Sequence, residues 1–366
     1  MKILWFTWKD KKNPLAGGAE IMNEELAERL VKDGNEVIFI TAGFSRCEKE
    51  EIRNGFKIIR VGNRWTVYWH AFLYYKKYLS EWPDFVIDEV NTIPFFAKFY
   101  TKKKNILIVY QLCRKIWFYQ MFFPLNVIGY ILEPLYLWLL NDKKVITISE
   151  SSKKDLIGFG FRAENISIIS VGIEIEPVSN LEIIKKFENP TILSLGAIRS
   201  MKRTAYVVKA FEIAKESIPN LELIVAGDAS GTYGQKVLNL IRNSKYSVSI
   251  QCLGRVNISQ KAELMQKAHL IVVTSVKEGW GLIVTEANSQ GTLAVVYNVD
   301  GLRDVVKNNQ TGIICDKNTP ANLAKKITEI LKNSELYKTL QKNGWEWSKE
   351  INFESSYKEF ILKINE

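Results

Sequence analysis

The sequence lacks the patterns that mark a disulfide framework, a zinc site or a dinucleotide site. Its four cysteines, at positions 47, 113, 252 and 315, lie far apart with no C-x-x-C pair. This favours reduced, buried thiols and therefore a cytosolic protein. No D-x-D pair occurs, so we expect chemistry that requires no metal. No G-x-G-x-x-G follows the first strand expected in either half, which disfavours a dinucleotide dehydrogenase.

An uninterrupted hydrophobic run that could cross a membrane is also lacking. The most apolar stretch, residues 125–140, follows Pro124 and contains Asn126 and the pair Glu133-Pro134. A charged residue at the centre of a span costs about 2.5–3.5 kcal/mol on insertion scales. We therefore expect a buried or interfacial helix here, and we favour burial over membrane contact.

Acidic residues are missing from one long segment. None occurs between Glu89 and Glu133, and the formal net charge of the chain is +10. The basic side chains in that segment are Lys98, Lys102, Lys103, Lys104, Arg114 and Lys115. With seven of the ten tryptophans in the first 140 residues, this composition suits peripheral contact with an anionic membrane, although packing on a sheet would explain many aromatics equally well. Nucleic acid is not an expected partner, because no RNP-like, zinc-finger or basic-helix signature is present.

The 366 residues, 47% hydrophobic and 25% charged, are typical of a globular protein with two domains. Ala19–Val31 has apolar residues every four positions, as an amphipathic helix requires, and the strand-like Lys2–Trp8 and Asn35–Thr41 flank it in a β-α-β unit. Because Ile3–Phe6 runs straight into the charged Lys9–Lys12, no signal peptide is expected. Further strands of a parallel sheet are expected at Phe56–Val61, Phe85–Val90, Ile106–Tyr110, Val145–Ile148 and Ile166–Val171.

The alternation of strands and helices restarts after a polar stretch, residues 174–190, that we interpret as an interdomain linker. Strands are expected at Thr191–Leu195, Leu221–Ala226, Val248–Leu253, Leu270–Thr274, Leu293–Tyr297 and Gly312–Cys315. The fold class is therefore α/β, with two Rossmann-like, doubly wound domains, 1–175 and 176–345, facing each other across a cleft. Ligands of such sheets bind at the carboxyl ends of the strands. The last segment, 346–366, is apolar at helical spacing and needs a surface to pack on.

The most informative segment is Lys277–Ala287, where Glu278 and Glu286 flank a glycine-broken turn. The preceding run, His269–Ser275, is typical of a strand covered on both faces, and a helix is expected from Leu282 onward. Glu278 then lies in the strand-to-helix loop and Glu286 in the first turns of the helix.

This arrangement would suit a phosphorylated sugar. The backbone N–H groups of Gly281 and Leu282 would point out of a helix N-terminus, where the helix dipole favours a phosphate. Carboxylates are good acceptors for sugar hydroxyls. The alternative is that both glutamates are simply solvated, as charged side chains usually are.

A second element, residues 195–203, predicts a strand that ends in a basic loop. Lys202 and Arg199 could neutralise a diphosphate leaving group, a role that a divalent ion plays in metal-dependent folds. A solvated basic loop is the alternative. A third element, Gly17-Gly18, stands at the N-terminus of the first helix, where missing β-carbons let the backbone approach a phosphate or sugar. This signal is weak alone, because G-G turns are common.

Together these elements resemble the donor-binding signature of the retaining glycosyltransferases of family 4, which have the GT-B fold. The resemblance spans nearly the whole chain and includes Gly17–Glu20, which matches the G-G-x-E loop of the family. It implies that Glu278 lies against the donor sugar and that Glu286 holds the ribose. The backbone of Gly279, Trp280, Gly281 and Leu282 would contact the diphosphate. It also implies that the segment 346–366 returns to the first domain.

The chain departs from the family pattern at three points. Lys202 matches the lysine of the motif G-R-x-x-x-x-K-G, but Ala197 replaces its arginine, and we expect Arg199 to substitute. Tyr110-Gln111 stands where many members have a histidine that contacts the transferred sugar, and the Tyr110 phenol could make that hydrogen bond instead. Leu293 follows Gly-Thr where proline is frequent.

The resemblance implies a retaining hexosyltransferase that uses a UDP- or GDP-linked sugar, without a metal cofactor, by front-face transfer. The acceptor would be a lipid-linked molecule or a glycan at the cytoplasmic face of the membrane. Two alternatives remain open. One is a sugar-nucleotide epimerase, which also has two facing α/β halves. The other is a non-catalytic module that binds a membrane or nucleic acid.

Overall fold

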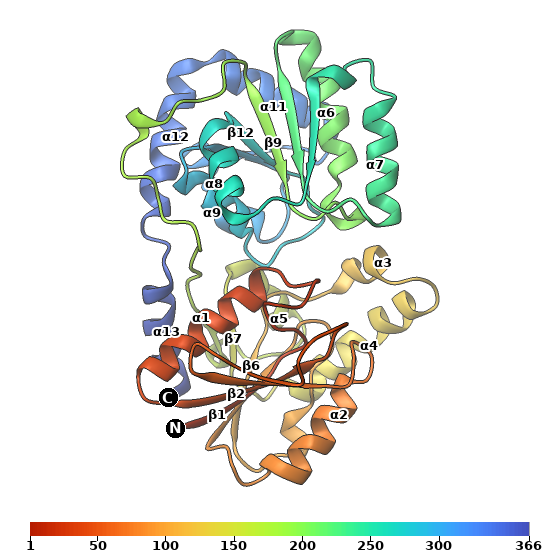
Figure 1. Ribbon diagram of the computed structural model, residues 1–366, viewed down its shortest axis with the longest axis vertical. Coiled ribbons are helices and arrows are strands. Elements are labelled where there is room, and N and C mark those ends of the chain that lie inside the picture. The colour runs from red at the N-terminus through yellow and green to blue at the C-terminus, as the bar shows by residue number, and fades with distance from the viewer. Residues whose placement is uncertain (366) are drawn as a thin grey trace. The chain divides into compact units, whose positions relative to one another are not determined.

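The computed structural model describes residues 1–365, which divide into two compact units (Figure 1). Unit 1 consists of Met1–Gly172 together with the segment that starts at Asn352, and unit 2 consists of Ile173–Ile351. The expected divisions lay after residues 175 and 345. The second of these falls inside helix α12 (Ser334–Ser348), which is part of unit 2 as a whole.

Unit 1 is built on one sheet with the strand order β3-β4-β2-β1-β5-β6-β7-β8. Its strands are β1 (Lys2–Phe6), β2 (Glu36–Ala42), β3 (Glu50–Arg53), β4 (Phe56–Val61), β5 (Phe85–Glu89), β6 (Lys104–Ile108), β7 (Val145–Thr147) and β8 (Ile166–Ile168). All neighbours pair in parallel except β3, which is antiparallel to β4. The expected parallel sheet is thus confirmed apart from β3, whose charged sequence EEIR gave no strand signal.

The helices of unit 1 cover this sheet and include the last helix of the chain. They are α1 (Gly18–Lys32), α2 (Val67–Tyr74), α3 (Trp117–Gln120), α4 (Leu125–Leu140), α5 (Glu150–Gly158) and α13 (Phe353–Asn365). Helix α13 lies beside α1 (Figure 1). Its Phe360 ring stacks on Trp5 of β1 with centroids 5.8 Å apart, and its Tyr357 hydroxyl donates to Asp33 at 2.6 Å. The apolar face of the last segment therefore completes the unit 1 core.

Unit 2 is built on an all-parallel sheet with the order β11-β10-β9-β12-β13-β14. Its strands are β9 (Thr191–Leu195), β10 (Glu222–Ala226), β11 (Ile250–Gly254), β12 (Leu270–Val273), β13 (Leu293–Val296) and β14 (Gly312–Ile314). Its helices are α6 (Thr204–Ser217), α7 (Thr232–Arg242), α8 (Ile258–Lys267), α9 (Leu282–Ser289), α10 (Leu302–Val305), α11 (Pro320–Lys332) and α12.

Successive residues of the central strand β12 pack on opposite faces of this sheet. Leu270 and Val272 belong to one hydrophobic cluster with residues of α6, α7 and α11, whereas Ile271 and Val273 join residues of α8, α9 and α10. Alternation with period two explains why the strand is apolar throughout, since both faces are covered. The doubly wound architecture expected from the sequence is confirmed.

The polar stretch before β9, which we interpret as an interdomain linker, follows the division between the units at Gly172 and Ile173 and packs on unit 2. Lys186 Nζ donates to the carbonyl oxygens of Ala268 and Gly291, at 2.8 and 2.7 Å, and to the Thr292 hydroxyl at 3.0 Å. Burial lowers the pKa of Lys186 to about 7. The segment is therefore docked on unit 2, because its lysine satisfies carbonyl groups of two neighbouring loops.

Helix α4 corrects the expectation that the apolar stretch 125–140 would be buried. Leu137 is fully buried, but Ile131 and Trp138 leave 65% and 63% of their surface exposed. The expected burial is therefore wrong for one face of this helix. No helix in residues 1–365 is both long and apolar enough to span a membrane.

The four thiols are free but differ in burial. Cys113 and Cys315 are buried, Cys47 is partly exposed and Cys252 is exposed. The expectation of buried thiols is wrong for Cys252, because its strand β11 lies at the edge of the unit 2 sheet with its side chains largely open to solvent.

Candidate active site

The motif around Glu278 lies between a strand and a helix of unit 2. Strand β12 ends at Val273 and α9 begins at Leu282, so Glu278 stands in the connecting loop and Glu286 in the helix. Gly281 precedes α9 with a φ of 96°, a left-handed conformation that glycine adopts without strain. The N–H of Val284 donates to the Gly281 carbonyl at 2.8 Å, whereas the N–H groups of Leu282 and Ile283 have no acceptor within the helix and are available to an anion.

Lys202 and Glu278 form an ion pair that joins the loops after β9 and β12. Lys202 Nζ lies 2.5 Å from Oε1 of Glu278, and the Ser275 hydroxyl donates to the same oxygen at 2.5 Å. The lysine and glutamate side chains keep 35% and 14% of their surface exposed. Because β9 and β12 are parallel neighbours, both loops leave the same edge of the sheet, where open α/β sheets bind ligands.

Thr274 fixes the backbone of the lysine loop against β12. Its hydroxyl lies 2.8 Å from the carbonyl oxygen of Lys202 and 3.1 Å from that of Arg203. The N–H of Val276 donates to the carbonyl of Met201 at 2.8 Å. Three contacts therefore hold the two loops together independently of the ion pair.

A second neighbour of the glutamate loop is the segment after β13. The N–H of Glu278 donates to the carbonyl of Asp300 at 3.1 Å, and Lys277 Nζ lies 3.3 Å from the Asp300 carboxylate. Gly301 has a φ of 77°, and a Cβ there would lie 2.3 Å from the carbonyl oxygen of Glu278. Only glycine permits this approach, so residue 301 helps to set the position of Glu278.

A small hollow opens beside the lysine. It has a volume of about 30 Å³, and Lys202, Thr274 and Ser275 help to line it. Such a volume holds about one water molecule, so this hollow is too small for a nucleotide or a sugar. In residues 1–365, no group of three or more His, Cys, Asp or Glu side chains could hold a metal ion.

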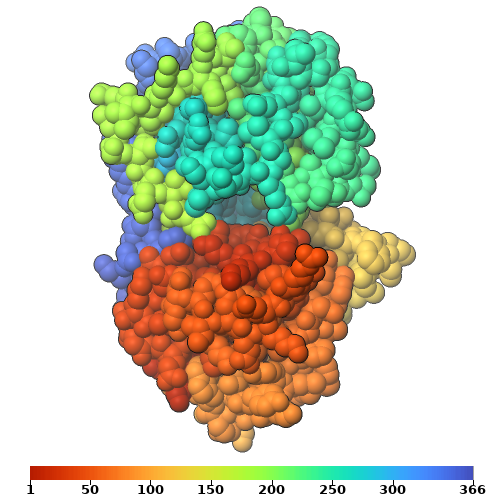
Figure 2. All heavy atoms as spheres, in the orientation of Figure 1, coloured from red at the N-terminus to blue at the C-terminus, as the bar shows by residue number. Residues whose placement is uncertain are grey.

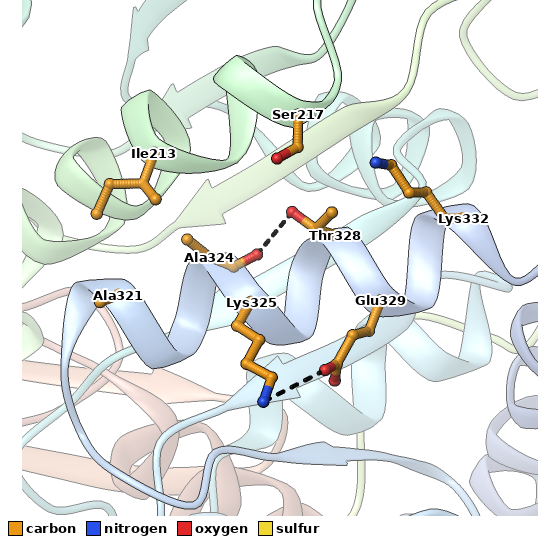
Figure 3. A pocket seen from close by; sticks show the side chains of 8 residues that line it. All are labelled: Ile213, Ser217, Ala321, Ala324, Lys325, Thr328, Glu329 and Lys332. Atoms are coloured by element: carbon orange, nitrogen blue, oxygen red, sulfur yellow. Dashed lines mark hydrogen bonds and ion pairs between the residues drawn. The ribbon is translucent and has the colours of Figure 1, made fainter.

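A larger groove, of about 350 Å³, lies elsewhere on unit 2, between α6 and α11 (Figure 3). Some of its polar groups pair locally, since Lys325 pairs with Glu329 at 3.8 Å and the Thr328 hydroxyl donates to the Ala324 carbonyl. No lining residue comes from the loops after β9 or β12. We therefore assign the chemistry to the sheet edge that carries Lys202 and Glu278.

Glu286 is held by a lysine of the neighbouring helix. Lys261 Nζ, from α8, lies 2.6 Å from the Glu286 carboxylate, which is almost fully buried. Burial raises the pKa of Glu286, and the charge and hydrogen bond of Lys261 oppose that effect. The Glu286 carboxylate is thus held in a fixed orientation by Lys261.

Arg199 and Trp280 are two further residues that the sequence predicts at the donor site. The Arg199 side chain is exposed, and it makes no ion pair with any residue from 1 to 365. The Trp280 indole donates to the Thr285 hydroxyl at 3.2 Å and its ring lies 6.3 Å from that of Trp347. Trp280 therefore packs against α12, while Gly279 and Gly281 shape the turn.

The Gly17-Gly18 turn of unit 1 is held by a hydrogen bond to Glu20. The N–H of Gly17 donates to the Glu20 carboxylate at 2.6 Å across the first turn of α1, and Gly18 is the first helical residue. Lys9 Nζ lies 3.1 Å from the same carboxylate. The loop therefore has a fixed shape that rests on a buried ion pair.

Tyr110 is engaged inside unit 1, contrary to a role as a free sugar contact. It leaves 8% of its surface exposed, and its hydroxyl donates to Asn23 at 2.5 Å. Asn23 in turn donates to Glu89 at 2.9 Å, and Thr7 also donates to Glu89. Burial raises the pKa of Glu89 to about 7. The neighbouring Gln111 is less buried, and its Oε1 accepts no hydrogen bond from residues 1–365.

Sequence reasoning missed three residues of these clusters. Ser275 ends the apolar run before Glu278, and this position after a buried strand was a usable signal. Lys261 lies 25 positions from Glu286, and no spacing rule connects them. Glu89 is the last residue of β5 and follows Asp88. Two acidic residues at the end of a strand resemble an ordinary solvated strand end, so the sequence did not mark Glu89.

Two family profiles match the chain and together cover most of it. The profile described as Glycosyltransferase Family 4 matches residues 16–177, and the one described as Glycosyl transferases group 1 matches residues 180–347. The second range contains Lys202, Glu278 and Glu286. The chain belongs to glycosyltransferase family 4. The family expected from the sequence is thus confirmed.

Curated relatives of this glycosyltransferase are 22–31% identical to it over the aligned residues. An uncharacterized glycosyltransferase of Methanocaldococcus jannaschii is 31% identical over 40% of this chain and 41% of its own length. A second from that organism is 26% identical over 90% of this chain and 89% of its own. The N-acetyl-alpha-D-glucosaminyl L-malate synthase of Bacillus anthracis is 22% identical over 89% and 88%. The match spans only about half the length of two of these relatives, 41% of the first and 55% of an uncharacterized glycosyltransferase of Haemophilus influenzae.

Solved structures share the fold of this glycosyltransferase at low sequence identity. Sucrose-phosphate synthase from Thermosynechococcus elongatus superposes with a TM-score of 0.78 at 18% identity, over 100% of this chain and 98% of its own. The HepE protein of Anabaena, in complex with UDP and glucose, superposes with a TM-score of 0.76 at 15% identity, over 100% and 99%. These similarities confirm the GT-B fold.

Proposed function

We propose that this glycosyltransferase moves a hexose from a UDP- or GDP-linked donor to a lipid-linked or glycan acceptor, with retention of the anomeric configuration. The ion pair of Lys202 with Glu278 carries the proposal. It lies at the carboxyl edge of the unit 2 sheet, within the region that matches the group 1 glycosyltransferases. A cation for phosphate and an acceptor for sugar hydroxyls thus stand side by side.

The donor is proposed to lie across the loops after β9 and β12. The free N–H groups at the start of α9, next to Gly281, bind the diphosphate, where the helix dipole favours negative charge. Glu286, oriented by Lys261, accepts the ribose hydroxyls, and Glu278 accepts hydroxyls of the sugar. The UDP in the HepE structure supports a nucleotide donor for a chain of this fold.

In the proposed reaction the bond between the anomeric carbon and the diphosphate oxygen breaks, and the acceptor oxygen bonds to the same face of the sugar. The proton of the acceptor hydroxyl passes to the departing phosphate oxygen, so no separate base is needed. Lys202 stabilises the charge that develops on the diphosphate. Because a side-chain cation fills this role, we propose that the reaction needs no metal ion. Arg199 contributes only if its exposed side chain turns toward the donor.

The acceptor is proposed to be a glycan or a lipid-linked molecule. The structure of TarM with fondaparinux, α-GlcNAc-glycerol and UDP covers 86% of this chain with a TM-score of 0.62, which supports a glycan acceptor. The basic and aromatic surface of unit 1 supports a lipid-linked one. Tyr110 is excluded as a direct contact unless its hydrogen bond to Asn23 breaks.

The first test is a thermal-shift panel of UDP, GDP, ADP and their sugars with EDTA and then with Mg²⁺. A ligand at a hundred times its Kd stabilises a protein by about 2.7 kcal/mol. We therefore expect one nucleotide series to raise the Tm in the absence of metal. A shift that appears only with Mg²⁺ contradicts the metal-independent chemistry.

Transfer itself is tested with the donor chosen by that panel and a mixture of lipid-linked and glycan acceptors. Nucleotide release that depends on the acceptor supports a transferase. Conversion of the donor sugar without an acceptor identifies an epimerase. An inverted product, seen in the anomeric proton coupling by NMR, contradicts the retaining mechanism.

A further inference from the structure

Helix α4 presents an apolar face to solvent. Ile128, Ile131, Leu132, Leu135 and Trp138 leave 46%, 65%, 47%, 53% and 63% of their surfaces exposed. Their spacing of three and four residues places them on one side of the helix. We call these five residues the apolar stripe. A contiguous exposed surface of this kind marks an interaction site in a soluble protein.

Aromatic residues extend the apolar stripe at its N-terminal end. Phe122 and Phe123, in the turn between α3 and α4, are 68% and 78% exposed, and Phe118 of α3 is 48% exposed. In Figure 2 the α3–α4 segment, drawn in yellow, stands out from the orange and red remainder of unit 1. The stripe and these rings therefore lie on a projecting part of the unit.

The opposite face of α4 fixes this orientation. The Glu133 carboxylate accepts hydrogen bonds from the N–H groups of Cys113 and Arg114, both at 2.7 Å, and from the Trp117 indole at 3.0 Å. Gly129 lets Trp117 pack on the helix, since a Cβ there would lie 2.5 Å from the ring. The single charge of α4 is thus used internally, and the stripe cannot rotate inward without breaking these bonds.

The segment that contains the apolar stripe has more basic than acidic residues. Between residues 90 and 149 the only acidic residues are Glu133 and Asp142. Glu133 is buried, and Asp142 is paired with Lys98 at 2.6 Å. Lys102, Lys115 and Lys144 of the same region are exposed. Exposed cations next to an apolar face complement anionic lipid headgroups.

The length of α4 decides how it would meet a membrane. Its 16 residues extend for about 24 Å at 1.5 Å per residue, which is shorter than the roughly 30 Å hydrocarbon core. We propose that α4 lies in the plane of an anionic membrane surface, with the apolar stripe and Phe122-Phe123 in the interfacial layer. This inference deepens the proposed function, because it would bring the enzyme to a lipid-linked acceptor. Its test needs neither donor nor turnover.

The experiment is co-sedimentation of the full chain with vesicles of phosphatidylcholine, with and without phosphatidylglycerol. The wild type should sediment with the anionic vesicles and much less with the neutral ones. The variant Ile131→Ser/Leu135→Ser/Trp138→Ser should bind at least about tenfold more weakly, because it removes most of the insertable apolar area. Since all three side chains are exposed, the variant should keep the thermal stability of the wild type.

A matched control removes three exposed apolar side chains elsewhere. Ile52, Ile183 and Val248 are 77%, 70% and 98% exposed, and their triple serine variant should bind like the wild type. Lys115→Glu/Lys144→Glu should weaken binding to anionic vesicles only. In hydrogen exchange, anionic vesicles should protect the amides of 118–139 in the wild type.

Three outcomes overturn the proposal. One is a wild type that sediments with neither kind of vesicle. Another is a stripe variant that binds as well as the wild type. The third is a chain that forms a dimer in solution, which the stripe variant makes monomeric, since a second copy then covers the stripe. Vesicle binding without any sugar transfer would leave the docking surface intact and contradict the proposed function alone.

Discussion

Lys202 Nζ lies 2.5 Å from Glu278 Oε1, although the two residues are 76 positions apart in the chain. The contact is made because β9 and β12 are neighbours in a parallel sheet, so the loops that follow them meet at one edge. The pair holds each side chain where a donor would need it.

Removal of the lysine should therefore affect the chemical step more than binding. In Lys202→Ala we expect kcat to fall by about a hundredfold to a thousandfold, as for loss of one charge-stabilising group, with a smaller change in KM. Lys202→Arg should recover part of the rate. Lys209→Ala removes an exposed lysine of α6 and should keep full activity. Steady-state kinetics with the donor from the thermal-shift panel checks this, and equal kcat in Lys202→Ala and Lys209→Ala would disprove the role.

Glu286 should act mainly in donor binding. We expect Glu286→Ala to raise the Kd for the nucleotide about tenfold to a hundredfold, because hydrogen bonds to a charged group are worth about 1.5–3 kcal/mol. Isothermal titration measures it. Lys261→Ala is the companion variant, since it keeps the carboxylate but removes its partner at 2.6 Å. Lys261→Ala should raise the Kd for the nucleotide less than Glu286→Ala does. Unchanged nucleotide affinity in Glu286→Ala would remove Glu286 from the donor site.

Gly301 should be intolerant of a side chain because of its contact with the glutamate loop. A Cβ would lie 2.3 Å from the Glu278 carbonyl oxygen and the φ of 77° is strained for other residues. Gly301→Ala should therefore lower both activity and Tm. Gly231→Ala is the control, since a Cβ there has no neighbour within 4 Å and its φ is −77°. Equal activity of both variants would show that the loop tolerates displacement.

The free energy of unfolding of unit 1 should depend on whether the Glu89 carboxyl group is protonated. Burial raises the pKa of Glu89 from 4.5 to about 7, so the folded protein keeps a proton that the unfolded chain has already lost. This contribution is complete below about pH 4.5 and is lost as the pH rises toward 7, at up to about 1.4 kcal/mol per pH unit.

The variant Glu89→Gln isolates this effect, because an amide keeps the neutral state at every pH. Between pH 5 and 8 the Tm of the variant should fall less than that of the wild type. The difference in Tm between the two proteins should be largest above pH 7. Calorimetry over that range gives both curves. Asp88, whose pKa burial raises to about 6, is present in both proteins and cancels in the difference. Parallel curves would contradict the assignment.

Much of the fold could be predicted because the relevant signals are local. Alternation between apolar strands and amphipathic helices predicted every strand of unit 2 within two residues, since a strand covered on both faces must be apolar throughout. Strand β3 escaped notice because an edge strand such as Glu50–Arg53 does not need apolar residues.

The sequence by itself determined the family, the doubly wound architecture and the loop positions of Lys202 and Glu278, because glycine-broken turns and apolar runs are properties of neighbouring residues. Only the tertiary structure decided which groups meet. It paired Glu286 with Lys261, turned the Tyr110 hydroxyl toward Asn23 and left the apolar stripe of α4 in solvent. Helical periodicity shows that a face is apolar. Whether that face is covered depends on the packing of residues distant in the chain.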